Sequence, residues 1–169
     1  MDVLKTIVTY IDKFSKYQAY MLVPFPLGLI LITMYDIVGR QLGLYTAWAF
    51  DTEWFIYGFI MMLGMAYAIL KDQHVKIDLL TARYSKRMQS ILVIVSYLVF
   101  TIPVMVIIAI NALGFAMDSK AQGETVLTAW YFQLWPIKLF IFIGIIFMLP
   151  QCLAEIIRHA YFLIKKEMP

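Results

Sequence analysis

Two long runs without a charged residue constrain the fold more than any other feature of this sequence. No residue is charged from Trp54 to Leu70 or from Met88 to Met117, which are 17 and 30 residues long. At a helical rise of ~1.5 Å per residue, the first run is near the lower limit for spanning a hydrocarbon core of ~30 Å, and the second exceeds that thickness. Because 63% of the 169 residues are hydrophobic, one small soluble core cannot bury them, and the sequence predicts an integral membrane protein.

Two further apolar stretches complete a predicted all-α membrane protein with four transmembrane helices, at residues 18–38, 52–70, 88–117 and 136–158. Pro24 and Pro26 remove backbone donors in the first span, so we expect a kink or a delayed helix start there. The long third span should tilt, kink at Pro103 or protrude from the membrane, and Pro150 is a candidate bend in the fourth. With no linker or internal repeat, residues 1–169 are expected to form a single domain.

Residues 1–17 precede the first span and differ from it in pattern. Apolar side chains recur there at helical spacing, with lysines between them: Leu4, Ile7, Val8, Ile11 and Phe14. This pattern predicts an amphipathic helix that lies on the membrane surface. The alternative is a partly ordered lead-in to the first span, because a lone helix of this length is marginal in water.

Basic residues indicate the orientation of the chain. The N-terminal segment, residues 71–87 and the C-terminal tail together hold 11 of the 14 Lys and Arg residues, whereas the two other loops hold only Arg40 and Lys120. The positive-inside rule therefore places both termini in the cytoplasm. The loops on the opposite side are net acidic, with Asp36, Asp51, Glu53, Asp118 and Glu124.

Charges around the first outer loop have three possible arrangements. Asp36 and Arg40 are four residues apart, so they could form an ion pair on one helix. Arg40 could instead face Asp51 and Glu53 across the short loop. In the third arrangement, all four side chains are solvated at the membrane interface.

Several function classes lack the residues they need. None of the four predicted spans has an ionisable side chain near its middle, where such groups are costly and mark ion or proton pathways, so the chain alone is a poor candidate for a pump or channel. The net charge of +3 is too small to suggest a nucleic-acid partner. The single cysteine, Cys152, excludes an internal disulfide framework.

Two histidines leave a redox alternative open. His74 and His159 are both expected near the cytoplasmic surface and could share a haem iron, as in the membrane anchor subunit of a redox complex. Asp72, His74 and Asp78 could also support enzyme chemistry. Interface, turn and helix-cap roles are the simpler interpretations of these residues, so we expect no cofactor, no metal site and no catalytic activity.

The stretch from Trp48 to Leu80 resembles the small membrane subunit of tripartite ATP-independent periplasmic (TRAP) transporters, the DctQ family. The likeness lies in Trp48, Asp51, Gly64-x-x-x-Ala68 and His74-Val75-Lys76-Ile77-Asp78-Leu79-Leu80. The family commonly has two adjacent glutamates where this chain has Phe50-Asp51, so one carboxylate carries over and the second is absent unless Glu53 replaces it. Val38-Gly39-Arg40, and Trp130 with Pro136, also match the family pattern.

The resemblance implies an accessory role in the bacterial inner membrane. Such small subunits pair with a larger, elevator-type membrane subunit that holds the sodium and organic-acid sites, and a periplasmic binding protein delivers the substrate. The small subunit enlarges the stationary scaffold and is surrounded by membrane lipids. The wording of residues 68–78, AI-x-x-DQH-V-x-ID, is most similar to sialic-acid transporters, although the small subunit should carry little substrate specificity.

Two sets of residues are the candidate interfaces. We expect an outer surface that helps to dock the binding protein to contain Arg40, Trp48, Asp51 and Glu53. Gly64 and Ala68 are four residues apart on one helix face, where small side chains let another helix approach closely. Together with the cytoplasmic anchor of the second span, they give a second expected interface, toward the large subunit: Gly64, Ala68, His74 and Asp78.

Overall fold

The computed structural model describes residues 2–71, 84–126 and 131–165. Within these ranges the chain is helical apart from short connections: α1 (Asp2–Leu22), α2 (Pro24–Gln41), α3 (Ala47–Leu70), α5 (Lys86–Val95), the π-helix η1 (Ser96–Thr101), α6 (Ile102–Gln122) and α7 (Trp135–Lys165). The β-structure in the described part of the chain is one isolated antiparallel bridge, between Thr125 and Gln133.

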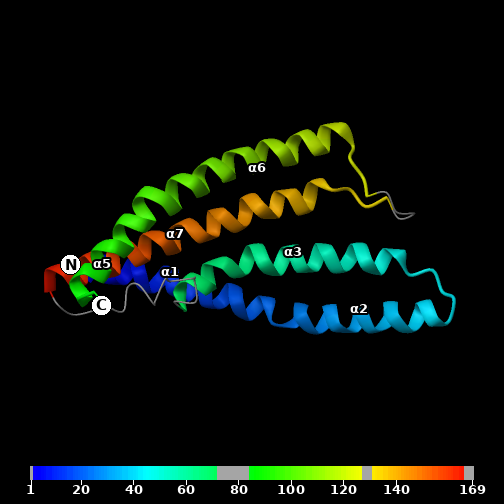
Figure 1. The fold of residues 1–169 in the computed structure, drawn as a ribbon, viewed down its shortest axis with the longest axis horizontal. Helices are drawn as coiled ribbons and strands as arrows, with labels where there is room; N and C mark the ends of the chain where they lie inside the picture. Colours follow the sequence, from blue (N-terminus) through cyan, green and yellow to red (C-terminus); the bar gives the residue numbers. More distant parts are fainter. Residues whose placement is uncertain (1, 72–83, 127–130, 166–169) are drawn as a thin grey trace.

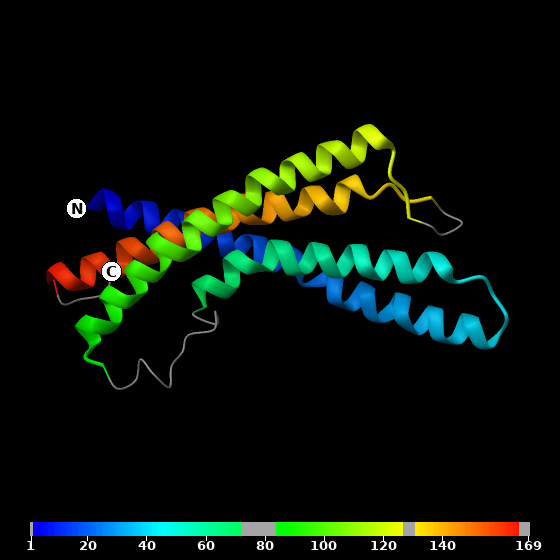
Figure 2. The ribbon, with the colours of Figure 1, turned by 45° about the horizontal axis from the view of Figure 1, so that its top comes forward.

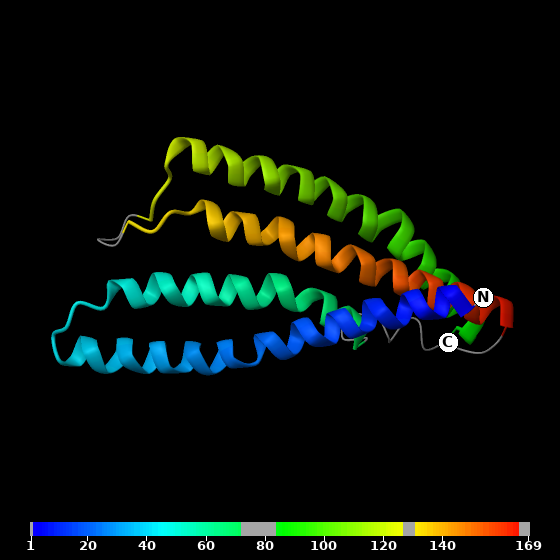
Figure 3. The ribbon, with the colours of Figure 1, turned by 180° about the vertical axis from the view of Figure 1, so that it is seen from behind.

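Four long helices lie side by side as a slab one helix thick, in the order α2, α3, α7, α6 (Figure 1). Turning the molecule by 45° shows α1 passing across this layer toward the N-terminus (Figure 2). From behind, α1 lies over parts of α3 and α7 (Figure 3), and it packs against both helices. Both described ends of the chain lie at one end of the slab, which we call the termini end, and the α2–α3 and α6–α7 connections lie at the loop end.

Four helical stretches are long and apolar enough to cross a membrane: Leu4–Gln41, Ala47–Leu70, Lys86–Ala121 and Trp135–Lys165. This confirms the expected number of such helices. The first stretch includes α1, which continues to Leu22, past the boundary at residue 17 that the sequence suggested. A surface location for the N-terminal helix and the cytoplasmic placement of both termini stay predictions.

The prolines interrupt helices where their missing N–H groups require it. Pro24 and Pro26 cannot donate to the carbonyls four residues earlier, and α1 ends at Leu22 before α2 begins at Pro24. The Val23 amide donates instead to the Tyr20 carbonyl, at 3.3 Å. The expected break in the first span is therefore present.

The third span contains a π-helical segment just before Pro103. The ring of Pro103 clashes with the carbonyl four residues earlier, and the π-helix η1 occupies Ser96–Thr101, immediately upstream. Pro150, in contrast, lies inside α7, which runs without interruption from Trp135 to Lys165.

The seam between α3 and α7 forms the centre of the slab. Its buried core contains Ile69, Met148 and Cys152. Gly144 lets the two backbones approach, because a Cβ atom there would lie 2.5 Å from the Met62 carbonyl oxygen. Toward the loop end, the rings of Phe59 and Phe140 continue the seam, with centroids 4.9 Å apart.

Candidate functional site

The α2–α3 turn at the loop end carries the candidate docking residues. Gly43 adopts a left-handed conformation (φ 71°), which ends α2 at low steric cost. The Leu44 amide donates to the Gly39 carbonyl at 2.9 Å, and the Gly43 amide donates to the Arg40 carbonyl at 3.2 Å. These two hydrogen bonds form a Schellman motif, which fixes the direction in which the chain leaves α2 just after Arg40.

Arg40 pairs with Asp36 on the same helix. The Arg40 Nη2 and Nε atoms lie 2.5 and 3.0 Å from the two carboxylate oxygens of Asp36, a bidentate arrangement. Asp36 is only 7% exposed and also bonds the buried Thr46, whereas the Arg40 side chain is 61% exposed. Of the three arrangements considered from the sequence, the pair within one helix is the one that forms.

Asp51 and Glu53 lie on α3, in the first two turns after the α2–α3 connection. Asp51 is buried, with 6% of its surface exposed. Glu53 attracts Arg40 electrostatically, and its Oε1 atom is buried without a hydrogen-bond partner among the described residues. The arrangement in which all four charges are solvated is therefore wrong for Asp36 and Asp51, because both residues are buried.

The Trp48 side chain, at the start of α3, packs against α2 rather than pointing away from it. Its ring centroid lies 5.4 Å from that of Tyr35, and its carbonyl accepts a hydrogen bond from Thr52 Oγ1 at 2.8 Å. Four large aromatic side chains of this region are exposed: Tyr35, Tyr45, Phe50 and Trp54. The loop end thus offers one exposed guanidinium among aromatic rings, above buried carboxylates.

The second expected interface is only partly described. Gly64 faces open space, since a Cβ atom there would meet nothing within 4 Å. Ala68, one turn further along α3, is half-buried. His74 and Asp78 lie outside the described residues, so the structure does not show whether they join Gly64 and Ala68.

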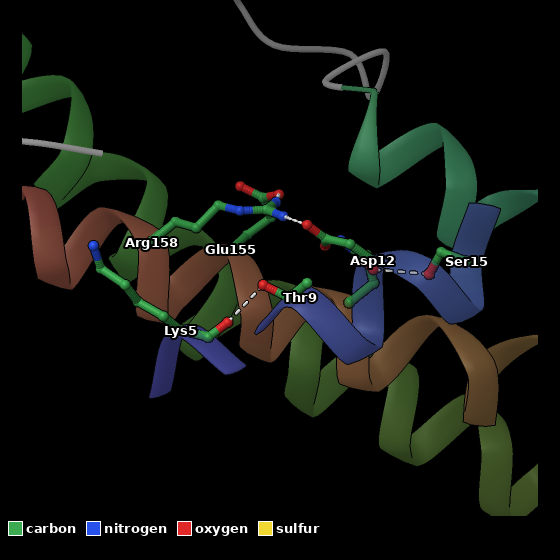
Figure 4. Close-up of polar contacts among 7 residues, drawn as sticks. Lys5, Thr9, Asp12, Ser15, Glu155 and Arg158 are labelled. Carbon is green, nitrogen blue, oxygen red and sulfur yellow. Dashed lines mark hydrogen bonds and ion pairs between the residues drawn. The ribbon is translucent and has the colours of Figure 1, made fainter. Parts of the chain in front are cut away.

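A polar network at the termini end was not anticipated from the sequence. Arg158 on α7 forms ion pairs with Asp12 on α1 and with Glu155 on its own helix (Figure 4). Gln151 accepts a hydrogen bond from Ser15 at 2.8 Å and donates one to Asp12 at 3.2 Å. The network fixes α1 against α7 through side chains that are mostly removed from solvent.

A sequence signal for this network does exist. Gln151, Glu155 and Arg158 recur at i, i+4 and i+7 along an otherwise apolar helix, which places them on one face. Asp12 and Ser15 show the matching i, i+3 spacing on α1. Each pattern marks a polar face on its own helix, but neither identifies the helix that this face contacts.

The histidine pair considered as an alternative for haem ligation lies only partly within the described residues. The His159 Nδ1 atom lies 3.1 Å from the hydroxyl of the buried Ser90, so it links α7 to α5. His74 lies outside the described residues. Among residues 2–71, 84–126 and 131–165, no group of three or more His, Cys, Asp or Glu side chains could hold a metal ion.

The sequence of this chain also matches a known protein family. A sequence model for the DctQ component of tripartite ATP-independent periplasmic transporters matches residues 29–161, most of the chain. The chain belongs to this family. It is therefore a TRAP small subunit, a multi-pass membrane protein and a component of a transporter. No curated protein matches the chain in sequence, and no solved structure matches it.

The matched residues 29–161 include all four expected docking residues and all of α3. Glu53, which could replace the second carboxylate of the family pattern, interacts electrostatically with Arg40. Within this TRAP small subunit, Glu53 is thus placed to take part in the charge cluster at the loop end.

Proposed function

We propose that this chain is the non-catalytic small permease subunit of a sodium-coupled TRAP transporter in the bacterial inner membrane. It scaffolds the large elevator-type subunit for the uptake of an organic acid that a periplasmic binding protein delivers. The observation that carries this proposal is the DctQ match, on a slab of helices that leaves many large apolar side chains exposed. The termini end is the cytoplasmic side, and the loop end faces the periplasm.

Exposure of the helices supports a scaffold role. In the third candidate span, Lys86–Ala121, none of the most apolar window is buried inside the chain, and in the first only 11% is buried. These surfaces must be covered by lipid or by another membrane protein. A slab one helix thick widens a partner laterally, and the α1–α7 network resists tilting of its helices against one another.

The distribution of charge supports a role without a transport pathway of its own. In the described helices, the paired charges gather toward the two ends: Asp36 with Arg40 toward the loop end, and Asp12 with Arg158 toward the termini end. Ion pathways instead place ionisable groups at membrane depth. Substrate and sodium are therefore assigned to the large subunit.

Two surfaces are assigned to the partners. Arg40 is the exposed contact for the binding protein, while the packed Trp48, Asp51 and Glu53 hold the turn that presents it. On the other side of the membrane, Gly64, Ala68, His74 and Asp78 contribute to the contact with the large subunit and anchor the end of α3. Substituting His74 and Asp78 by Ala should lower recovery of the large subunit in a pull-down, and normal recovery would count against this assignment.

The test of the proposed function is sodium-driven uptake into proteoliposomes. This chain would be reconstituted alone, with the large subunit, and with both the large subunit and the binding protein. Sialic acid and C4-dicarboxylates would be the substrates, sialic acid first because of the wording of residues 68–78. Uptake only with all three components is expected, and uptake by this chain alone would refute the scaffold role.

A further inference from the structure

A groove of about 310 Å³ opens where the α1–α2 junction passes α3. Its walls include Lys16, Tyr20 and Pro26 from the first two helices and Ile60, Gly64 and Tyr67 from α3. The groove exists because Gly64 has no side chain and nothing lies within 4 Å of where its Cβ would be. The α1–α2 break and this glycine together leave a space that no side chain of the described chain fills.

The groove has a cationic end and an apolar end. Lys16 lines the end toward the termini, where the Lys71 ammonium lies 5.8 Å from the centroid of the Tyr67 ring. Two positive charges therefore flank this end. The opposite end is closed by Pro26 and Ile60 and has no charged lining residue.

The distance from the apolar end of the groove to Lys71, beyond its cationic end, matches half a membrane. Eleven residues of helix separate Ile60 from Lys71, which is ~16 Å at the helical rise. This is about half of a ~30 Å hydrocarbon core, the depth of one leaflet. A hydrogen bond beside the groove holds α1 to α3: the Gln18 side chain donates to the Leu63 carbonyl at 2.8 Å.

We propose that this groove binds one anionic phospholipid from the leaflet at the termini end. Its phosphate contacts the Lys16 and Lys71 ammonium groups, and one acyl chain lies along Ile60 and Gly64. Charge complementarity selects this occupant, because two cations at headgroup level above an uncharged apolar slot match the order of groups in an anionic lipid. The lipid fills the gap at the α1–α2 break and fastens α1 to α3.

The test compares two lipids on the purified, delipidated full chain by native mass spectrometry. Dioleoyl phosphatidylglycerol and dioleoyl phosphatidylcholine would be offered at equal concentration, and retention of one phosphatidylglycerol molecule in preference is expected. Lys16→Gln or Lys71→Gln should each lower the ratio of retained phosphatidylglycerol to phosphatidylcholine about fivefold. Lys86→Gln is the matched control, because Lys86 is an exposed lysine at the same end on α5, a helix that contributes no residue to the groove lining.

A second variant tests the shape of the groove. Gly64→Leu fills the slot without changing a charge, so it should lower retention of both lipids while the helical circular dichroism of the chain is kept. Equal retention of the two lipids by the wild type, or an equal loss of preference in Lys86→Gln, would overturn the proposal. A Gly64→Leu variant that retains phosphatidylglycerol as well as the wild type does would also overturn it, since the slot would then not hold the lipid. Lipid retention is measured on the chain alone, so its failure would leave the proposed transport role unaffected.

Discussion

The α1–α7 network makes a quantitative prediction about Arg158. This guanidinium is 15% exposed and lies between two carboxylates, Asp12 and Glu155, whose side chains are 20% and 11% exposed. Arg158→Met would leave two partly buried carboxylates close together without their cation. Removing one partner from a buried ion pair costs ~3–5 kcal/mol, and the residual exposure places this site near the lower end, about 3 kcal/mol.

Asp12→Asn perturbs the same network in the opposite way. Arg158 keeps Glu155 as its partner, and the amide can still accept a hydrogen bond, so the expected loss is about 1 kcal/mol. For a chain of this size, about 3 kcal/mol lowers the unfolding temperature by roughly 6–12 °C, and about 1 kcal/mol lowers it by roughly 2–4 °C. The order of the two variants is therefore as informative as their size.

Thermal unfolding of the detergent-solubilised full chain is the assay. Lys13→Met is the matched control, because Lys13 is an exposed lysine on α1 next to Asp12 in sequence. Limited proteolysis of α1 gives a second readout, since a detached α1 should become accessible. If Arg158→Met unfolds at the temperature of Lys13→Met, or if Asp12→Asn is the more damaging change, the inference that this network fixes α1 is refuted.

Three further predictions concern other parts of the slab. Gly144→Ala should lower the unfolding temperature by several degrees, because its Cβ would collide with the backbone of α3, whereas Gly114→Ala, which meets open space, should not. The Lys138 ammonium holds the pKa of Glu124 below its usual range, so the stabilisation is present at neutral pH and is lost as pH falls through that lowered value. The unfolding temperatures of the wild type and of Glu124→Gln should accordingly differ at about pH 7 and converge once the pH lies below the lowered pKa of Glu124. Arg40→Gln should weaken docking of the binding protein and its salt dependence, and unchanged docking would remove Arg40 from that surface.

The number of long apolar helices was predictable because it depends on composition along the chain. Charges are excluded from Trp54–Leu70 and Met88–Met117 by the cost of burying them in hydrocarbon, and this signal needs no knowledge of neighbours. The break at Pro24 follows from local covalent chemistry in the same way. The backbone conformation before Pro103 could not be predicted in this way, because a π-helical turn and a kink both relieve the same clash.

Contacts between distant segments were harder to predict. Spacing allowed Asp36 to pair with Arg40, yet it could not exclude a pair across the loop, because that choice depends on how the α2–α3 turn packs. Asp12 finds Arg158 on the last helix, 146 residues away, and no local pattern in α1 identifies that partner. Local rules gave the helices and their breaks, whereas the burial of Asp51 and the polar network required the tertiary arrangement.

The order of helices in the slab has a consequence for how the chain is assembled in the membrane. The pairs α2–α3 and α6–α7 are each consecutive in sequence and closed by a connection at the loop end, so each forms a helical hairpin from its own contacts. The α3–α7 seam joins the hairpins, and α1 also needs α7 for its polar partners. Insertion can therefore proceed hairpin by hairpin, while lateral closure waits for the last helix to be synthesised. A chain that stops before α7 would leave α1 and the first hairpin in the membrane with their partner surfaces open, which is the state a membrane quality-control protease could recognise.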